Sequence, residues 1–265
     1  MYTLKKLIDI LIKVKNLPTL SPIVLMLMQS LNEEEPDVQR ISQIISDDPP
    51  TAGMILKLAN SAMYGARRTI SSVQDAVVRL GFQEIREIVI DLTMVKYLSA
   101  MPESVLGMVE FWEHSIGVAF CMEEIQVTTH LLEKDAPLCH VVGLLHDIGR
   151  LITATHMPEV HQQFSEDSKE INSPETVIMW EKEVIGLDHT QIGAAVLERW
   201  GLPMEIVNGV RYHHQPDISP LPQRKASYLT CLADCICRKL KLGSAGEGAI
   251  GEIEESLWDK LEISS

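Results

Sequence analysis

Residues 141–150 read Val141-Val-Gly-Leu-Leu-His-Asp-Ile-Gly-Arg150, an apolar run interrupted by one histidine and one aspartate. The run indicates a buried helix, and burying an imidazole beside a carboxylate is costly unless the two groups pair or bind a cation. His146 and Asp147 are therefore candidate metal ligands, and a buried hydrogen-bonded pair is the competing interpretation. Arg150 follows three residues after Asp147, where its guanidinium suits a phosphate oxygen. Asp147 and Arg150 are the candidate catalytic residues.

Helical periodicity extends over nearly the whole chain, and the alternating runs typical of strands are nearly absent. Asp48-Pro49 and Ser173-Pro174 have the form of helix starts, and Asp188 with Gln191 has the spacing of a capping box. The sequence predicts an all-α fold. We expect helices at residues 3–16, 21–31, 37–47, 49–63, 73–80, 82–99, 104–129, 137–156, 158–169, 174–185, 189–199, 203–214, 222–241 and 254–261.

The break at Met101-Pro102-Glu103-Ser104 is a plausible seam between two parts of the chain, and all nine histidines follow it. We expect an N-terminal helical subdomain at residues 1–103, packed on a metal-binding helical bundle at residues 104–242. Residues 243–265 are expected to form a loop and a short helix.

Composition excludes several classes of protein. Hydrophobic residues make up 46% and charged residues 23% of the 265 residues, which is typical of a globular protein and not of a disordered one. The apolar runs are far shorter than the roughly 20 residues that span a membrane, so we expect no membrane association. A net charge of −14 disfavours general binding of nucleic acid. The five cysteines are odd in number and lack C-x-x-C spacing, which favours reduced thiols and a cytoplasmic location.

Further polar residues lie on apolar helical faces. Glu110 and His114 are one helical turn apart on one face, and Asp234 interrupts another apolar run. His213 and His214 diverge by about 100° on a helix, so both reach one cavity only near a helix end. The further candidate ligands are Glu110, His114, His189, His213, His214 and Asp234. His130, His140, His156 and His161 show no such pattern and are interpreted as ordinary histidines.

A single inward-facing polar residue is usually a satisfied core group, and Glu110 alone is most simply a solvated glutamate. Several such residues on different helices are better explained by a shared cation, because each offsets the burial of the others. Histidine and carboxylate donors suit iron, manganese, nickel or zinc better than Ca²⁺ or Mg²⁺. We expect one or two divalent ions, and a pair of ions suits in-line displacement at phosphorus.

The chain resembles the HDOD family, a bacterial signalling branch of the HD superfamily, over roughly residues 8–245. The motifs that carry the resemblance are Leu17-Pro18-Thr19-Leu20, Ile44-Ile45-Ser46-Asp47-Asp48-Pro49, Leu56-Lys57-Leu58-Ala59-Asn60-Ser61, Phe111-Trp112-Glu113-His114-Ser115, Leu144-Leu145-His146-Asp147-Ile148-Gly149, Trp200-Gly201-Leu202-Pro203 and Tyr212-His213-His214. The resemblance implies an all-helical HDOD fold.

The resemblance also implies ligands. His114, His146, Asp147 and Asp234 match the ligand positions of HD phosphohydrolases, while His189, His213, His214 and Glu110 match the additional ligands of the related HD-GYP phosphodiesterases. Gln215-Pro216-Asp217-Ile218 follows the histidine pair in place of a GYP element, which argues against cyclic dinucleotide hydrolysis. Arg150 stands where those enzymes frequently have lysine.

Two functions remain open at this stage. One is a metal-dependent phosphohydrolase acting on a phosphomonoester or phosphodiester. The other is a non-catalytic signalling scaffold whose metal site is structural or sensory. The carboxylate-rich histidine site also suggests a third alternative, iron-based sensing of oxygen or redox state. The partner would be a signalling protein or a small phosphorylated or nucleotide ligand.

Overall fold

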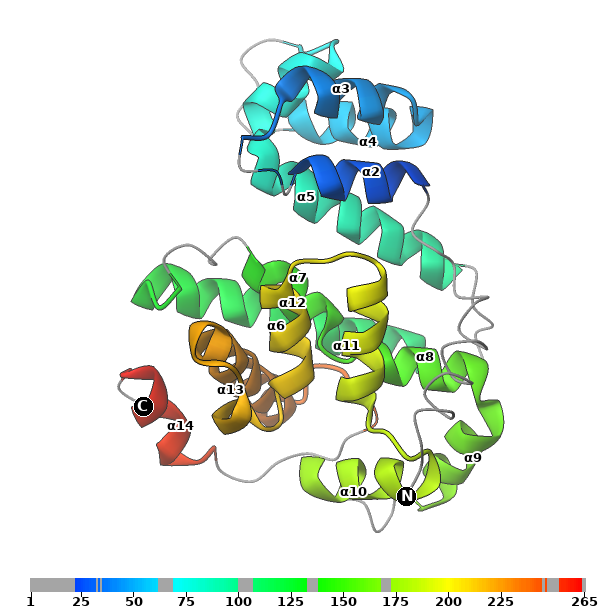
Figure 1. The fold of residues 1–265 in the computed structure, drawn as a ribbon, viewed down its shortest axis with the longest axis vertical. Coiled ribbons are helices and arrows are strands. Elements are labelled where there is room, and N and C mark those ends of the chain that lie inside the picture. Colours follow the sequence, from blue (N-terminus) through cyan, green and yellow to red (C-terminus); the bar gives the residue numbers. More distant parts are fainter. Residues whose placement is uncertain are drawn as a thin grey trace. The chain divides into compact units, whose positions relative to one another are not determined.

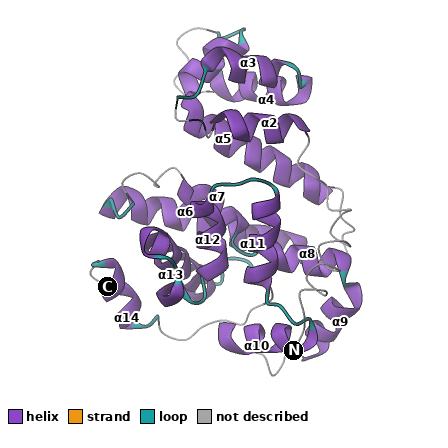
Figure 2. Cartoon of the chain, in the orientation of Figure 1, coloured by secondary structure: helices purple, strands orange, loops and turns teal. Residues whose placement is uncertain are grey.

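The structure, a computed structural model, describes residues 22–31, 33, 35–61, 69–99, 107–132, 138–167, 173–244, 246 and 253–263. The described residues form α-helices and short 3-10 helices, and no strand occurs among them (Figure 2). The predicted all-α fold is confirmed. No helix among the described residues combines the length and the apolar character that crossing a membrane requires. The helix predicted at residues 3–16 lies outside the described ranges.

The described residues fall into two compact units, one within residues 18–100 and one within residues 101–265. The three-part division of the chain, and the packing of its first part on its second, stay predictions. The smaller unit contains α2 (Pro22–Leu31), α3 (Val38–Ser46), α4 (Pro49–Ala59) and α5 (Val73–Ser99) (Figure 1).

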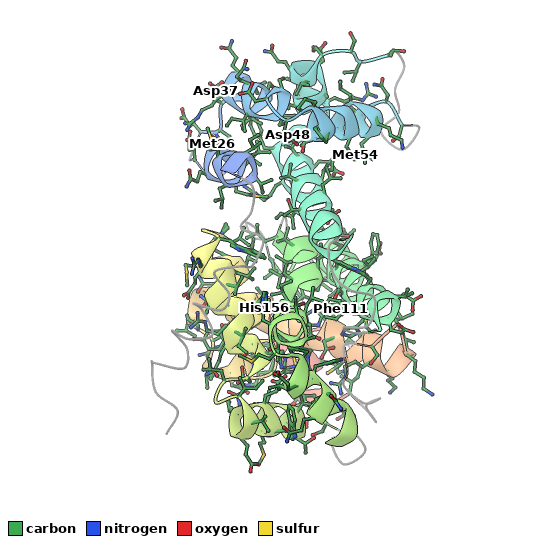
Figure 3. The ribbon with its side chains drawn as sticks, turned by 90° about the vertical axis from the view of Figure 1, so that its right-hand side faces the viewer. Met26, Asp37, Asp48, Met54, Phe111 and His156 are labelled. Atoms are coloured by element: carbon green, nitrogen blue, oxygen red, sulfur yellow. The ribbon has the colours of Figure 1, made fainter. Side chains whose placement is uncertain are left out.

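Side-chain caps begin two helices of the smaller unit, and the sequence predicts the one at Asp48. The side chain of Asp37 accepts from the backbone N–H of Gln39 at the start of α3, and that of Asp48 accepts from Thr51 at the start of α4 (Figure 3). Gly81 interrupts α5 with φ of 84° and ψ of 163°, a conformation that L side chains rarely adopt. The predicted division into helices before and after residue 81 is therefore confirmed.

The larger unit contains the predicted candidate site. Its helices are α6 (Met108–Thr129), α7 (Cys139–Leu145), α8 (Ile148–His156), α9 (Pro158–Asp167), α10 (Pro174–Val184), α11 (His189–Arg199), α12 (Met204–Tyr212), η4 (Pro216–Ile218), η5 (Leu221–Gln223), α13 (Arg224–Leu240) and α14 (Glu255–Leu261). Helix α6 packs against α7 and α13, and α11 packs against α8 and α12 (Figure 1). Four helices that carry candidate ligands thus surround the short helices α7 and α8.

One helix prediction is wrong at the His146-Asp147 doublet of the candidate site. The sequence predicts a continuous helix at 137–156, but α7 ends at Leu145 and α8 begins at Ile148. Asp147 lies outside helical geometry, with φ of −101° and ψ of 12°. Its carbonyl accepts from the backbone N–H of Arg150 at 2.9 Å, a bond typical of a tight turn. Apolar periodicity continues through the break, so the pattern did not reveal it.

Candidate metal centre

Two glycines place the His146-Asp147 doublet against its neighbours. A Cβ on Gly143 would lie 2.5 Å from the Cα of Ala119 on α6, and a Cβ on Gly149 would lie 1.9 Å from the carbonyl oxygen of His189 on α11. The backbones approach so closely at both positions that only hydrogen fits. The doublet is therefore held between α6 on one side and the start of α11 on the other.

One group of candidate ligands forms where α6, α7 and α13 meet. His114, His146 and Asp234 offer ligand atoms that all lie within 4.8 Å of one another. Nε2 of His114 lies 3.1 Å from Oδ1 of Asp234, and the rings of His114 and His146 are 5.2 Å apart between centroids. All three side chains are buried.

A second group forms where the break before α8 meets α11 and the end of α12. Asp147, His189, His213 and His214 also offer ligand atoms within 4.8 Å of one another. Oδ1 of Asp147 lies 3.3 Å from Nε2 of His189 and 3.9 Å from Nε2 of His213. The helix α12 ends at Tyr212, which allows both following histidines to reach the same place, as predicted for a helix end.

Asp147 joins the two groups. Its Oδ2 lies 3.3 Å from Nε2 of His146 in the first group, while its Oδ1 faces the second. The seven residues of both groups are called the HD cluster below. Their order along the chain is His114, His146, Asp147, His189, His213, His214 and Asp234.

Hydrogen bonds fix the ring orientation of three histidines. Nδ1 of His146 donates to the carbonyl of Gly143 and Nδ1 of His213 donates to the carbonyl of Val210, each at 2.7 Å. Nδ1 of His189 donates to Oε2 of Glu181, also at 2.7 Å. A proton held on Nδ1 leaves the lone pair of the neutral ring on Nε2, the atom that faces the cluster.

Glu181 was missed by the sequence analysis. It is buried on α10, and its Oε2 also accepts from the backbone N–H of His189 at 2.9 Å, so one carboxylate orients both the ring and the start of α11. A signal was available, because Glu181 lies between Val177 and Ile185 on the apolar face of its helix.

Arg150 is buried, and its Nε donates to Oδ1 of Asp147 at 3.0 Å. Its NH1 nitrogen also lies 3.8 Å from Oε1 of Glu181. The guanidinium thus connects a cluster carboxylate with the carboxylate that orients His189. Its predicted contact with a phosphate oxygen stays a prediction.

The pKa values of three cluster residues are shifted in different directions. Burial lowers the pKa of His146, but the adjacent Asp147 carboxylate, Asp234 and the carbonyl of Gly143 together outweigh burial and raise that pKa to about 9. Burial acts against the Asp147 carboxylate too, yet His146 and Arg150 hold the pKa of Asp147 well below its usual range. The pKa of His213 is lowered well below its usual range by burial and by neighbouring His214 and His146. The doublet is therefore an ion pair at neutral pH, and His213 is neutral.

The donor atoms fit a divalent metal. Nε2 of His146, His189 and His213 are buried and make no hydrogen bond of good geometry, although Asp147 oxygens lie 3.3, 3.3 and 3.9 Å away, and buried polar atoms are nearly always satisfied. Neighbouring donors around an ion with bonds of about 2.1 Å lie about 3 Å apart, close to the 3.1 and 3.3 Å separations in the cluster. Imidazole and carboxylate donors are those that iron, manganese, nickel and zinc share.

The structure does not bring every predicted residue into the cluster. Glu110 is exposed at the first turn of α6 and belongs to neither ligand group. It lines a cavity beside the cluster, as does His161, which shows no ligand pattern in the sequence. Its role as a ligand stays a prediction.

Comparison with known proteins places the chain in a family. The model of the HDOD domain matches residues 17–216, most of the chain. The chain belongs to the HDOD family. An HDOD domain protein of unknown function from Geobacter sulfurreducens has a similar structure, with a TM-score of 0.74 and 26% identity over 97% of this chain and 87% of that one. A presumed phosphohydrolase from Shewanella amazonensis has a TM-score of 0.72 and 26% identity over 96% and 88% of the two chains.

The curated relatives are longer than this HDOD chain. An uncharacterized protein of Treponema pallidum is 26% identical over 257 residues, which are 96% of this chain and 47% of that protein. Ribonuclease Y of Thermus thermophilus is 29% identical over 150 residues, which are 57% of this chain and 19% of that protein. The chain thus spans about half or less of the length of these relatives.

Proposed function

We propose that this HDOD chain binds one or two divalent metal ions in the HD cluster and with them hydrolyses a phosphoester bond in a signalling context. The convergence of seven buried or half-buried donors from separate elements is the observation that carries the proposal. The similarity to a presumed phosphohydrolase and to a ribonuclease supports phosphorus as the site of reaction.

The two ligand groups suggest how the ions would be held. His114, His146 and Asp234 would hold one ion, and His189, His213 and His214 a second, with one oxygen of Asp147 for each. A divalent ion in such a site polarises a phosphoryl oxygen and activates water. Glu181 and the carbonyls of Gly143 and Val210 keep the imidazole rings oriented. Arg150 holds Oδ1 of Asp147 in place and adds a positive charge beside the cluster, which favours an anionic substrate.

Metal analysis and an activity panel test this proposal. Protein purified without chelator should contain one to two equivalents of metal, and Asp147→Ala should contain less. The panel should contain a phosphomonoester, p-nitrophenyl phosphate, a phosphodiester, bis-p-nitrophenyl phosphate, and a short RNA. Hydrolysis of at least one by the wild type, lost in Asp147→Ala, supports catalysis. Equal rates for both proteins on every substrate would refute it.

A non-catalytic scaffold is the second candidate, and burial favours it. His146 and His213 are 0% exposed and Asp147 is 2% exposed, so the cluster offers a substrate little open surface. In this case the metal stabilises or switches a binding surface for a signalling partner in the cytoplasm. Capture of one defined partner by the metal-loaded protein, with no turnover in the panel, would favour this candidate over hydrolysis.

A further inference from the structure

A cavity of about 360 Å³ lies beside the HD cluster, lined by residues of α8, α9 and α10 and of the start of α6. None of the seven cluster residues is among the described residues that line it. Its volume is at the lower end of the range for small-molecule sites, about 300 to 1,000 Å³. The cavity therefore suits one small molecule rather than a dinucleotide or a peptide.

The first recognition element of the cavity is an aromatic corner. Phe164 on α9 and Trp180 on α10 lie in an edge-to-face pair with ring centroids 5.1 Å apart, and both line the cavity. A Cβ on Gly246 would lie 3.2 Å from the ring of Phe164, so the backbone after α13 also closes on this corner. Aromatic side chains that line a cavity favour a flat ring that packs against them.

The second recognition element is a surplus of hydrogen-bond acceptors. Glu110 contributes an exposed carboxylate to the walls. Glu181 contributes a second one, whose Oε2 already accepts from His189, so that its Oε1 is the acceptor left for a ligand. The one guanidinium, that of Arg150, is bonded to Asp147. Burial lowers the pKa of His161, which therefore adds no charge at neutral pH. Gly107 leaves room for Glu110, because a Cβ there would lie 2.6 Å from its Oε2. Such walls repel a phosphate group and favour a ligand with N–H donors.

Hydrogen bonds connect two residues of the cavity wall with two candidate metal ligands. Arg150 faces the cavity and donates to Asp147, and Glu181 faces the cavity and accepts from His189. A ligand that contacts Arg150 would shift the side chain that holds Asp147. A ligand that contacts Glu181 would shift the side chain that orients His189. Occupancy of the cavity and occupancy of the metal site are coupled if that contact differs between the two states.

We propose that this cavity is an effector site for a small flat heteroaromatic molecule whose edge carries N–H donors, of the kind found in an amino-bearing nucleobase, and that Arg150 and Glu181 transmit its occupancy to the HD cluster. The aromatic corner stacks the ring and the carboxylates of Glu110 and Glu181 accept from its edge. Arg150 borders both this cavity and the cluster, and occupation of the cavity does not require turnover.

Binding is tested on the full chain by isothermal titration with adenosine, guanosine, cytidine, uridine and, as a control without a base, ribose. We expect at least one of the three amino-bearing nucleosides to bind with a Kd below about 1 mM. Uridine should bind at least threefold more weakly, and ribose should not bind. Absence of binding by all three amino-bearing nucleosides, or equal binding by ribose, would overturn the assignment of the ligand class.

Variants then locate the site. Trp180→Leu should weaken binding at least tenfold, whereas Trp180→Phe keeps an aromatic wall and should stay within threefold of the wild type. Glu110→Gln, on an exposed side chain that carries little risk to folding, should weaken binding about fivefold or more. Trp258→Phe on α14, outside the cavity, is the matched control. Unchanged affinity in both Glu110→Gln and Trp180→Leu would place any bound nucleoside elsewhere and refute the site.

Coupling is measured with Mn²⁺ as the probe metal. The Mn²⁺ affinity should change at least threefold at saturating nucleoside, and the nucleoside affinity should change by the same factor at saturating Mn²⁺, because linkage is reciprocal. Nucleoside binding with no change in Mn²⁺ affinity would refute transmission to the cluster. These titrations involve no substrate, so failure of the phosphohydrolase proposal would leave their outcome intact.

Discussion

At the scale of single residues, Asp147 is the central group of the candidate site. One oxygen faces His146 and the other faces His189 and His213, so a single carboxylate serves both ligand groups. Its own charge is secured by His146 and Arg150, which keep its pKa well below the usual range. No single substitution elsewhere in the cluster removes a donor that both groups share.

The first prediction concerns protons displaced by metal. In the metal-free protein the pKa of His146 is raised to about 9, above the ordinary value of 6.5, so the ring is protonated at pH 7.5. A ligand nitrogen must be deprotonated, and metal binding should therefore release close to one proton at pH 7.5 and fewer as the pH rises through 9. Calorimetric titration with Mn²⁺ in two buffers of different ionisation enthalpy measures the release. Binding without proton release at pH 7.5 would contradict the ligand role of His146.

The same shift gives the metal-free protein a defined pH dependence. A raised pKa means that the His146–Asp147 ion pair contributes stability that is fully present below pH 6.5 and is lost as the pH rises toward about 9. The lowered pKa of His213 acts in the opposite direction, because its protonation costs stability as the pH falls below 6.5. Urea midpoints should accordingly be highest near pH 6.5 and decline toward both lower and higher pH, and a midpoint that rises between pH 7 and 9 would be inconsistent with this assignment.

A third prediction isolates Glu181. Replacement by Gln keeps the shape of the side chain but removes the charge that orients His189, so Mn²⁺ affinity should fall by about 10- to 100-fold. Glu183→Gln, on the exposed side of the same helix, removes the same charge and should change affinity by less than twofold. Equal effects of both variants would indicate a general electrostatic contribution instead of an orienting hydrogen bond.

At the scale of helices, the sequence predicted most of what the structure contains. The capping box at Asp188 and Gln191 and the Ser173 cap are present, and α11 has the predicted bounds, because caps and periodicity are local properties. The break at Asp147 and the burial of Glu181 depend on tertiary neighbours, the α6 and α11 backbones and the ring of His189. A local sequence pattern does not show which distant residues pack against it, so it predicted neither feature.

The two close-packed glycines provide a test at this scale. Gly149→Ala places a methyl group against the backbone carbonyl of His189, so we expect a loss of about 1 to 3 kcal/mol of stability and weaker Mn²⁺ binding. Gly53→Ala, in an exposed part of α4 with nothing within 4 Å of the added carbon, should instead be neutral or stabilising by up to about 1 kcal/mol. Urea denaturation and Mn²⁺ titration measure both effects. A Gly149→Ala protein as stable as the wild type would show that α8 and α11 can separate without cost.

At the scale of the whole molecule, the two units differ in what they contribute. All seven cluster residues lie in the unit within residues 101–265, and among the described residues the smaller unit supplies none. All four tryptophans also belong to the larger unit, at positions 112, 180, 200 and 258. Tryptophan fluorescence therefore reports on the unit that carries the candidate site.

Metal removal should destabilise that unit. At a metal concentration 100 times the Kd, binding to the folded state contributes about 2.7 kcal/mol, and chelation removes it. The urea midpoint followed by tryptophan fluorescence should fall on addition of chelator in the wild type and remain unchanged in His213→Ala. If the wild-type protein contains metal and its urea midpoint does not change on addition of chelator, the ion does not stabilise the larger unit, whose unfolding tryptophan fluorescence follows.

The spacing of the ligands has a consequence for synthesis in the cell. The first group pairs His114 with Asp234, and the helices that carry them lie at opposite ends of the larger unit's sequence. A growing chain on the ribosome thus exposes isolated imidazoles long before the last carboxylate emerges. If the cluster holds a metal ion as proposed, tight capture must await the release of α13, and the ion bound then depends on the ions available at that moment.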